Sequence, residues 1–331
     1  MYLPIAQNKR NTVIAMALFL LIFLVFGSFL GVLFGYRGSL PRGILIDWGA
    51  FFSVLLVVLG MAGLYLLYMY RSADMTMLRQ SGAREISSST DSKLYSMVQN
   101  LAITSGIPMP RVYLINDSAP NAFATGRDPD HSSIAITTGL IDIMEDVELE
   151  AVIGHELSHI KNYDIRVSTI VFGMTALMGI VVSIAFRAYL FAPRSRSNNN
   201  SNSQNTGVLF LVIMVIALIM KGFMGLLSLV ISRQREYLAD ASSAELMHNS
   251  DALANALEKL RDNSVEVKKY NVAGAHLFFA DPDTGDTPKK VGKGGIASKI
   301  HNLFNTHPPL ETRIARLRGF GDVKQGFLAS R

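Results

Sequence analysis

The chain has 331 residues, no cysteine, a net charge of +5 and 50% hydrophobic residues, with a mean hydropathy of +0.29. This composition is too apolar for an ordinary soluble protein, and the lack of cysteine excludes disulfide bonds and thiolate metal sites. The positive charge lies mainly beside apolar segments and in the C-terminal region, where anionic lipid headgroups account for it. We therefore expect a lipid bilayer as a partner and no nucleic acid.

Four long apolar runs predict transmembrane helices, because each has the roughly 20 residues that a bilayer crossing requires. They cover residues 12–35, 48–70, 165–192 and 208–231. The first is too long for the apolar core of a cleavable signal peptide. Basic residues near the ends of the runs are more numerous on the side of both termini, so we expect that side to be cytoplasmic. The run at 208–231 contains Lys221, and the pattern leaves open whether this residue lies within the membrane.

The apolar runs divide the chain into four parts. These are an N-terminal transmembrane hairpin at 1–70, a polar block at 71–164, a second hairpin at 165–231 with a polar outer loop at 193–206, and a polar block at 232–331. The first polar block predicts a helix at 91–105 and short strands at 111–115, 121–125 and 133–138. We expect a mainly helical α+β fold with a small sheet. An edge strand of that sheet could bind an extended peptide or be purely structural.

The stretch His155-Glu156-Leu157-Ser158-His159 reads H-E-x-x-H within a predicted helix at 146–162. Residues four apart share one face of a helix, so both imidazoles can bind one metal ion. Glu156 lies beside them as a candidate base for a metal-bound water. The alternative is a solvated helix with two incidental histidines, and the surrounding sequence decides against it.

A catalytic zinc ion usually takes three protein ligands and leaves one position open for water. Glu236 is the candidate for the third ligand, and Asp240, four residues later, can accept a hydrogen bond from the ring of a ligating histidine. Two apolar runs separate His159 from Glu236, so the chain returns to the same membrane face and the two segments can meet. The alternative for this segment is an exposed helix with scattered charges.

Four motifs follow one another along the chain. They are Asn121-Ala122-Phe123-Ala124-Thr125-Gly126, then H-E-x-x-H, then Ser232-Arg233-x-x-Glu236-x-x-Ala239-Asp240, and finally Thr306-His307-Pro308-Pro309 with Arg313. Together they resemble the HtpX-type membrane zinc metalloproteases, which are relatives of the CAAX prenyl endopeptidase, and the resemblance covers nearly the whole chain.

The resemblance implies a gluzincin-like domain with one zinc ion per chain, on a bundle of four transmembrane helices in the cell inner membrane. It implies endoproteolysis of misfolded or damaged membrane proteins as part of a stress response, often with self-cleavage, and a cytoplasmic active site. It makes Asn121, Ala122, Phe123 and Ala124 part of a substrate-binding strand. It also places His307 and Arg313 near the catalytic centre, with His307 stabilising the oxyanion and Arg313 binding substrate. The residues alone favour a helix-cap role for His307 before two prolines, and the resemblance reverses this preference.

Two other functions are possible. A specific processing protease of the CAAX prenyl type would carry more spans around an enclosed chamber, and four spans are too few for one. A non-catalytic membrane scaffold would bind zinc structurally, which usually requires four protein ligands. Only three ligand candidates occur here, and Glu156 is left to act as a base.

Overall fold

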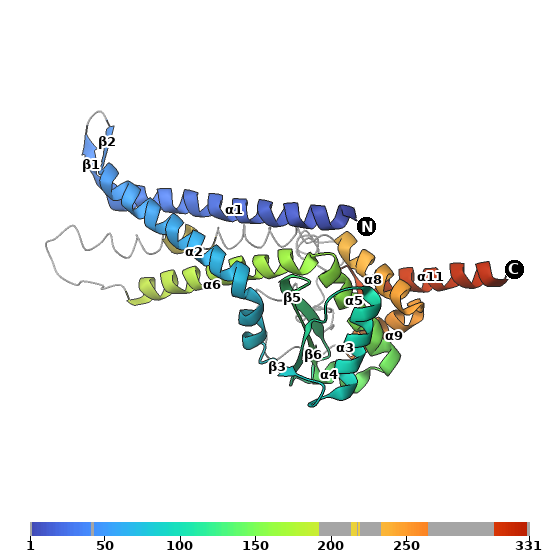
Figure 1. Ribbon diagram of the computed structural model, residues 1–331. Helices are drawn as coiled ribbons and strands as arrows, with labels where there is room; N and C mark the ends of the chain where they lie inside the picture. Colours follow the sequence, from blue (N-terminus) through green and yellow to red (C-terminus); the bar gives the residue numbers. More distant parts are fainter. Residues whose placement is uncertain are drawn as a thin grey trace. The chain divides into compact units, whose positions relative to one another are not determined.

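The computed structural model describes residues 2–40, 43–191, 213–216, 218, 233–263 and 308–329 (Figure 1). They form mainly helices with a small sheet, as the sequence predicts. The chain divides into two compact units. Unit 1 comprises Met1–Asn11, Ser72–Ile170 and Ser228–Arg331, and unit 2 comprises Thr12–Arg71 and Val171–Leu227.

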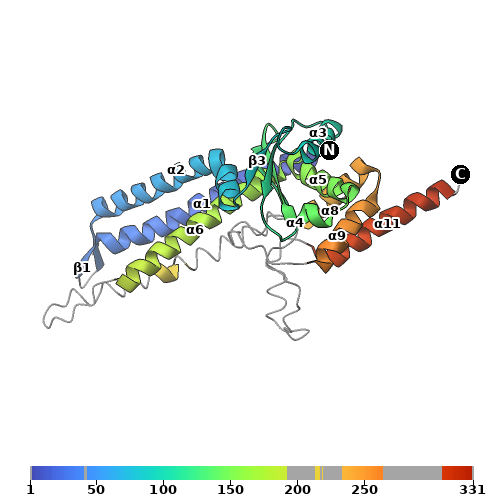
Figure 2. The ribbon, with the colours of Figure 1, turned by 90° about the horizontal axis from the view of Figure 1, so that it is seen from below.

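Three helices are long and apolar enough to cross a membrane, and their spanning segments are Ile5–Gly35, Trp48–Gln80 and Asp164–Arg187. They belong to α1 (Tyr2–Gly35), α2 (Trp48–Gln80) and α6 (Asp164–Phe191), and a hairpin of β1 (Tyr36–Leu40) and β2 (Gly43–Ile46) joins the first two. Within unit 2, these helices run side by side (Figures 1 and 2). The Tyr65 hydroxyl of α2 donates a hydrogen bond to the Gly173 carbonyl of α6 at 2.7 Å.

Three of the four predicted spans thus correspond to described helices. The fourth, at 208–231, lies outside the described residues except for 213–216 and 218, as do Lys221 and the polar loop at 193–206.

The sheet of unit 1 has four strands in the order β3-β4-β6-β5. Their bounds are β3 (Arg84–Ile86), β4 (Arg111–Ile115), β5 (Ala122–Asp128) and β6 (His131–Thr137). β4 pairs with β6 in parallel, while β5 and β6 form an antiparallel hairpin. The sequence predicts three of these strands, with a turn at 126–130. The structure instead continues β5 to Asp128, because Gly126 adopts a φ of 141° in a β-bulge.

The helices of unit 1 begin and end at recognisable caps. α3 (Ser92–Ser105) begins where the Asp91 carboxylate accepts a hydrogen bond from the Leu94 N–H, and it ends at Gly106 in the left-handed conformation. At the start of α5, the Glu148 carboxylate accepts a hydrogen bond from the Glu145 N–H at 2.8 Å. The other helices are α4 (Thr138–Ile143), α5 (Asp146–Lys161), α8 (Arg233–Met247), α9 (Ser250–Asp262) and α11 (Leu310–Ala329).

Helix α5, which carries the H-E-x-x-H motif, forms the centre of unit 1. It contacts α3, α8, α9 and β5, and its apolar side chains Ile153, Leu157 and Ile160 are fully buried. Gly154 lets α8 approach closely, since a Cβ atom there would lie 3.1 Å from the Ser243 hydroxyl oxygen. That hydroxyl donates a hydrogen bond to the Ala151 carbonyl at 2.6 Å. Helices α5 and α8 are therefore in close contact at Gly154, directly next to His155.

We predict that Gly154→Leu lowers the free energy of unfolding by about 1–3 kcal/mol, the usual cost of overpacking a filled interface. Thermal unfolding of the purified protein in detergent measures the change. Val147→Leu on the same helix is the matched control, because Val147 is 47% exposed and has room for the larger side chain. Unfolding of Gly154→Leu at the same temperature as Val147→Leu would contradict the close contact between α5 and α8.

Candidate metal centre

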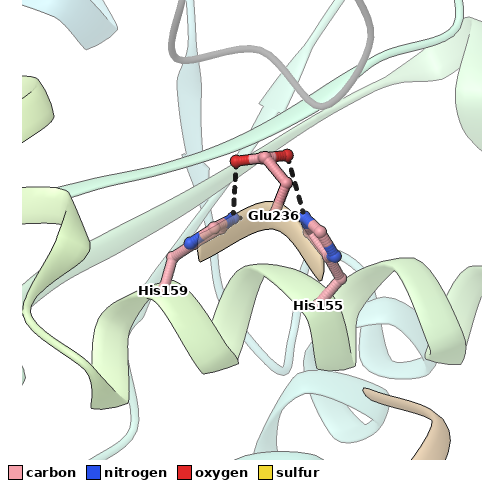
Figure 3. Close-up of side chains that lie close together, drawn as sticks. All are labelled: His155, His159 and Glu236. Carbon is pink, nitrogen blue, oxygen red and sulfur yellow. Dashed lines mark hydrogen bonds and ion pairs between the residues drawn. The ribbon is translucent and has the colours of Figure 1, made fainter. Parts of the chain in front are cut away.

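Helices α5 and α8 bring His155, His159 and Glu236 together, and one ligand atom of each lies within 4.8 Å of the others. The two Nε2 atoms are 3.1 Å apart. The nitrogen of His155 lies 3.8 Å from Glu236 Oε2, and that of His159 lies 3.6 Å from Glu236 Oε1. Both rings rise from one face of α5 toward the carboxylate of α8 (Figure 3). Their spacing of four residues accounts for this shared direction.

The donor set fits a zinc ion. Ligand atoms bound tetrahedrally at roughly 2.0–2.1 Å from zinc lie about 3.3 Å from one another. The two Nε2 atoms are 3.1 Å apart, close to this value, and each lies 3.6–3.8 Å from a different oxygen of Glu236. Two imidazoles and a carboxylate are also a ligand combination found in catalytic zinc sites. This group can therefore hold a metal ion with one coordination position left open.

Each histidine has a buried carboxylate behind its ring. Asp240 Oδ1 lies 3.0 Å from His155 Nδ1, and Asp164 Oδ2 lies 3.0 Å from His159 Nδ1. A carboxylate in this position accepts the Nδ1–H and leaves the Nε2 lone pair for a metal. The hydrogen bond to Asp164 therefore fixes the tautomer and the direction of the His159 ring, and the Asp240 carboxylate beside Nδ1 favours the same tautomer of His155.

Arg313 of α11 holds Asp240 in place through both carboxylate oxygens. Its Nη2 donates to Oδ1 at 2.7 Å and its Nε donates to Oδ2 at 2.9 Å, and the arginine is fully buried. Burial alone would raise the pKa of Asp240, but Arg313 and His155 outweigh it and lower that pKa to about 2. Burial likewise disfavours the charged form of Arg313, and the Asp240 carboxylate outweighs burial and raises its pKa. Arg313 thus lies behind the ligating histidine, and its predicted contact with substrate stays a prediction.

The two histidines have opposite pKa shifts. Burial lowers the pKa of His155 to about 4, so its ring is neutral at neutral pH. Burial also acts to lower the pKa of His159, but the hydrogen bond to Asp164 and the charge of Glu236 outweigh it and raise the pKa to about 9. A cation that binds at Nε2 of His159 replaces a proton there, because only the neutral imidazole is a ligand.

Glu156 is buried and follows His155 directly on α5. Its negative charge contributes to the raised pKa of both His159 and Arg313. The carboxylate is therefore close enough to the metal centre to affect its charged groups, which is consistent with the predicted general base.

The residues of the predicted substrate strand lie in or next to β5, which is an edge strand among those described and contacts α5. All of them are buried, namely Asn121, Ala122, Phe123 and Ala124. The Asn121 N–H donates to the Thr137 hydroxyl at 2.8 Å. His307 lies outside the described residues.

Sequence reasoning missed Asp164 and its partners Asn8 and Arg235. Asp164 follows His159 by five residues, after α5 has ended and after Tyr163 with a φ of 61°. No helical spacing relates the two residues. The sequence feature that could have predicted the role of Asp164 is an acidic residue just after the motif helix. Asn8 belongs to a part of the chain that is remote in sequence.

Comparison with known proteins identifies the family. Residues 88–320 match the sequence model of Peptidase family M48. Similar proteins include a Protease HtpX homolog of Tropheryma whipplei (strain Twist), 39% identical over 97% of this chain and 99% of its own length, and one of Lactobacillus helveticus (strain DPC 4571), 37% identical over 96% and 99%. A crystal structure of S. mikatae Ste24p has a TM-score of 0.44 and 20% identity, covering 92% of this chain and 62% of that one. This chain belongs to peptidase family M48 and is an HtpX-type membrane metalloprotease.

Proposed function

We propose that the protein is a zinc-dependent endopeptidase of the cell inner membrane that hydrolyses peptide bonds of misfolded or damaged membrane proteins and cleaves itself. The observation that carries the proposal is the group of His155, His159 and Glu236, with Glu156 beside it. A structural zinc site usually has four protein ligands, whereas three protein ligands favour an open, catalytic site.

The roles of the residues follow from their positions. When bound, a zinc ion lowers the pKa of its water to about 7 and polarises the substrate carbonyl. Glu156 takes the proton of the attacking water and passes it to the leaving amine. Asp240 and Asp164 keep the Nε2 atoms of the two histidines directed at the metal.

We propose that an extended substrate pairs with β5, which is an edge strand beside the motif helix, since an edge strand can add a further strand with little sequence preference. His307 would donate a hydrogen bond to the oxyanion as charge develops on the substrate carbonyl. The polar blocks at 71–164 and 232–331 together form a gluzincin-like domain, and the chain forms transmembrane hairpins at 1–70 and 165–231. An enzyme that acts on many unfolded chains needs a binding mode with little sequence preference, such as pairing with an edge strand, whereas a specific processing protease does not.

We predict that Glu156→Gln lowers peptide-bond cleavage by about 10²–10⁴-fold, the usual contribution of general base catalysis. The amide keeps the size of the side chain but cannot accept a proton. Cleavage of an unfolded membrane protein by purified enzyme gives the rate, and the zinc content should equal that of the parent. The change Glu150→Gln, at a half-buried position of the same helix, is the matched control. Proteolysis by Glu156→Gln at the rate of Glu150→Gln would remove Glu156 as the base.

We predict that His155→Ala loses most of the bound zinc. Asp240→Asn and Asp164→Asn should each bind zinc about 10–100-fold more weakly, because the amide does not hold the ring as a carboxylate does. Titration of each variant against a fluorescent zinc chelator measures these affinities. His131→Ala is the control, because His131 is the exposed first residue of β6. Parental zinc content in His155→Ala would rule out this ligand set.

We predict that both polar blocks and both termini are cytoplasmic, because basic residues are more numerous on that side of the spans. A protease added to cells stripped of their outer layers should cut within residues 193–206 and within neither polar block. A cut within 71–164 or 232–331 in intact membranes would reverse the orientation.

A further inference from the structure

A buried polar cluster joins the N-terminal end of α1 to the metal centre within unit 1. The Asn8 side chain is 2% exposed, and its amide nitrogen donates to Asp164 Oδ1 at 2.6 Å and to the Asn162 carbonyl at 2.8 Å. The other oxygen of Asp164 faces His159 Nδ1 at 3.0 Å. A residue at the start of the chain is therefore two hydrogen bonds away from a predicted metal ligand.

The chemistry of its neighbours fixes the direction of the Asn8 amide. The side-chain oxygen accepts a hydrogen bond from Arg235 Nη1 at 2.7 Å, while the NH₂ group faces two acceptors. The reversed amide would place its oxygen against a carboxylate and a carbonyl, and its NH₂ group against a guanidinium. Arg235 itself reaches Asp164 Oδ1 only at 3.4 Å, so Asn8 makes the shorter contact to that oxygen.

Lys9, the next residue of α1, contacts the turn at Tyr163 that precedes Asp164. The Lys9 ammonium lies 4.6 Å from the centre of the Tyr163 ring, and the Arg166 guanidinium lies 5.1 Å from it. Tyr163 has a φ of 61°, a left-handed conformation that is unfavourable for a non-glycine residue and needs support from its surroundings. Asn8 and Lys9 thus both stabilise the short turn that presents Asp164.

We propose that Asn8 is a positioning residue of the metal centre: it fixes the Asp164 carboxylate, which in turn holds the His159 ring toward the metal. The proposal rests on the metal site of the proposed function. Without the Asn8 amide, the outer oxygen of the Asp164 carboxylate keeps, among the described residues, the longer contact to Arg235, and the carboxylate can rotate. The His159 ring then loses its fixed direction, and the metal binds more weakly.

Asn8→Asp tests the donated hydrogen bond separately from packing. The carboxylate has nearly the size of the amide and can still accept from Arg235, but it cannot donate to Asp164. Asn8→Ala adds neither charge nor bulk, and it replaces Asn8→Asp in the experiment if a second buried carboxylate prevents folding. Gln7→Glu is the matched control, because it makes the same amide-to-carboxylate change at an exposed neighbour on α1.

The measurement is the zinc affinity of full-length protein in detergent, titrated against a fluorescent chelator. The absorption spectrum of the Co²⁺-loaded protein reports the coordination geometry. We expect Asn8→Asp and Asn8→Ala to bind zinc about tenfold more weakly and to have altered Co²⁺ bands, the lower end of the range for partners behind a ligand. Gln7→Glu should match the parent.

A double-mutant comparison shows whether Asn8 acts through Asp164. On an Asp164→Asn background, Asn8→Ala should weaken zinc binding by less than about twofold further, since the effects of coupled residues do not add. Parental zinc affinity of both Asn8 variants, or an undiminished effect of Asn8→Ala on that background, would overturn the proposal. If His155→Ala keeps its zinc, the proposed metal site has failed instead.

Discussion

The metal centre depends on two buried carboxylates that hold two imidazole rings in place. A histidine four residues from another shares its helix face, but its ring still rotates, and a metal requires both Nε2 atoms at one point. Asp240 and Asp164 supply this constraint, each at 3.0 Å from a ring Nδ1. They come from α8 and from the beginning of α6, so the site exists only when these two segments have assembled around α5.

The carboxylates in turn need partners, because a buried charge without one is costly. Arg313 binds Asp240 through both oxygens, and Asn8 and Arg235 bind the outer oxygen of Asp164. Removing one member of such a buried pair typically costs about 3–5 kcal/mol. With every acid and guanidinium ionised and both histidines neutral, the centre has a net charge of −2, which suits a divalent cation. This net charge comes from four buried carboxylates and two buried guanidinium groups, namely Glu156, Asp164, Glu236, Asp240, Arg235 and Arg313.

Local patterns in the sequence were enough to predict the parts of the fold and site that depend on short-range spacing. The motif helix, the three described apolar helices and three of the four strands follow from periodicity. Glu236 and Asp240 were inferred from their spacing of four on α8. Asp164 was missed because it follows the end of a helix, where no periodic rule applies. Asn8 was missed because its contacts join residues 154 or more positions apart.

The strand β5 illustrates the same limit. Its extension to Asp128 depends on a bulge at Gly126, where a Cβ atom would lie 2.3 Å from the His131 carbonyl oxygen. The sequence Gly126-Arg127-Asp128-Pro129 is typical of a turn, and only the pairing with β6 shows that the strand continues. Tertiary contacts therefore determine both the end of this strand and the outer partners of the candidate metal centre, whereas local motifs are enough to predict the candidate ligands.

The ligand environment of zinc in the purified protein tests the central claim most directly. X-ray absorption at the zinc edge should show four nitrogen or oxygen neighbours at about 2.0–2.1 Å, two of them imidazoles. The His155→Ala protein, loaded with excess zinc, should show at most one imidazole. A shell without imidazole scattering, or two imidazoles in both proteins, would contradict the account.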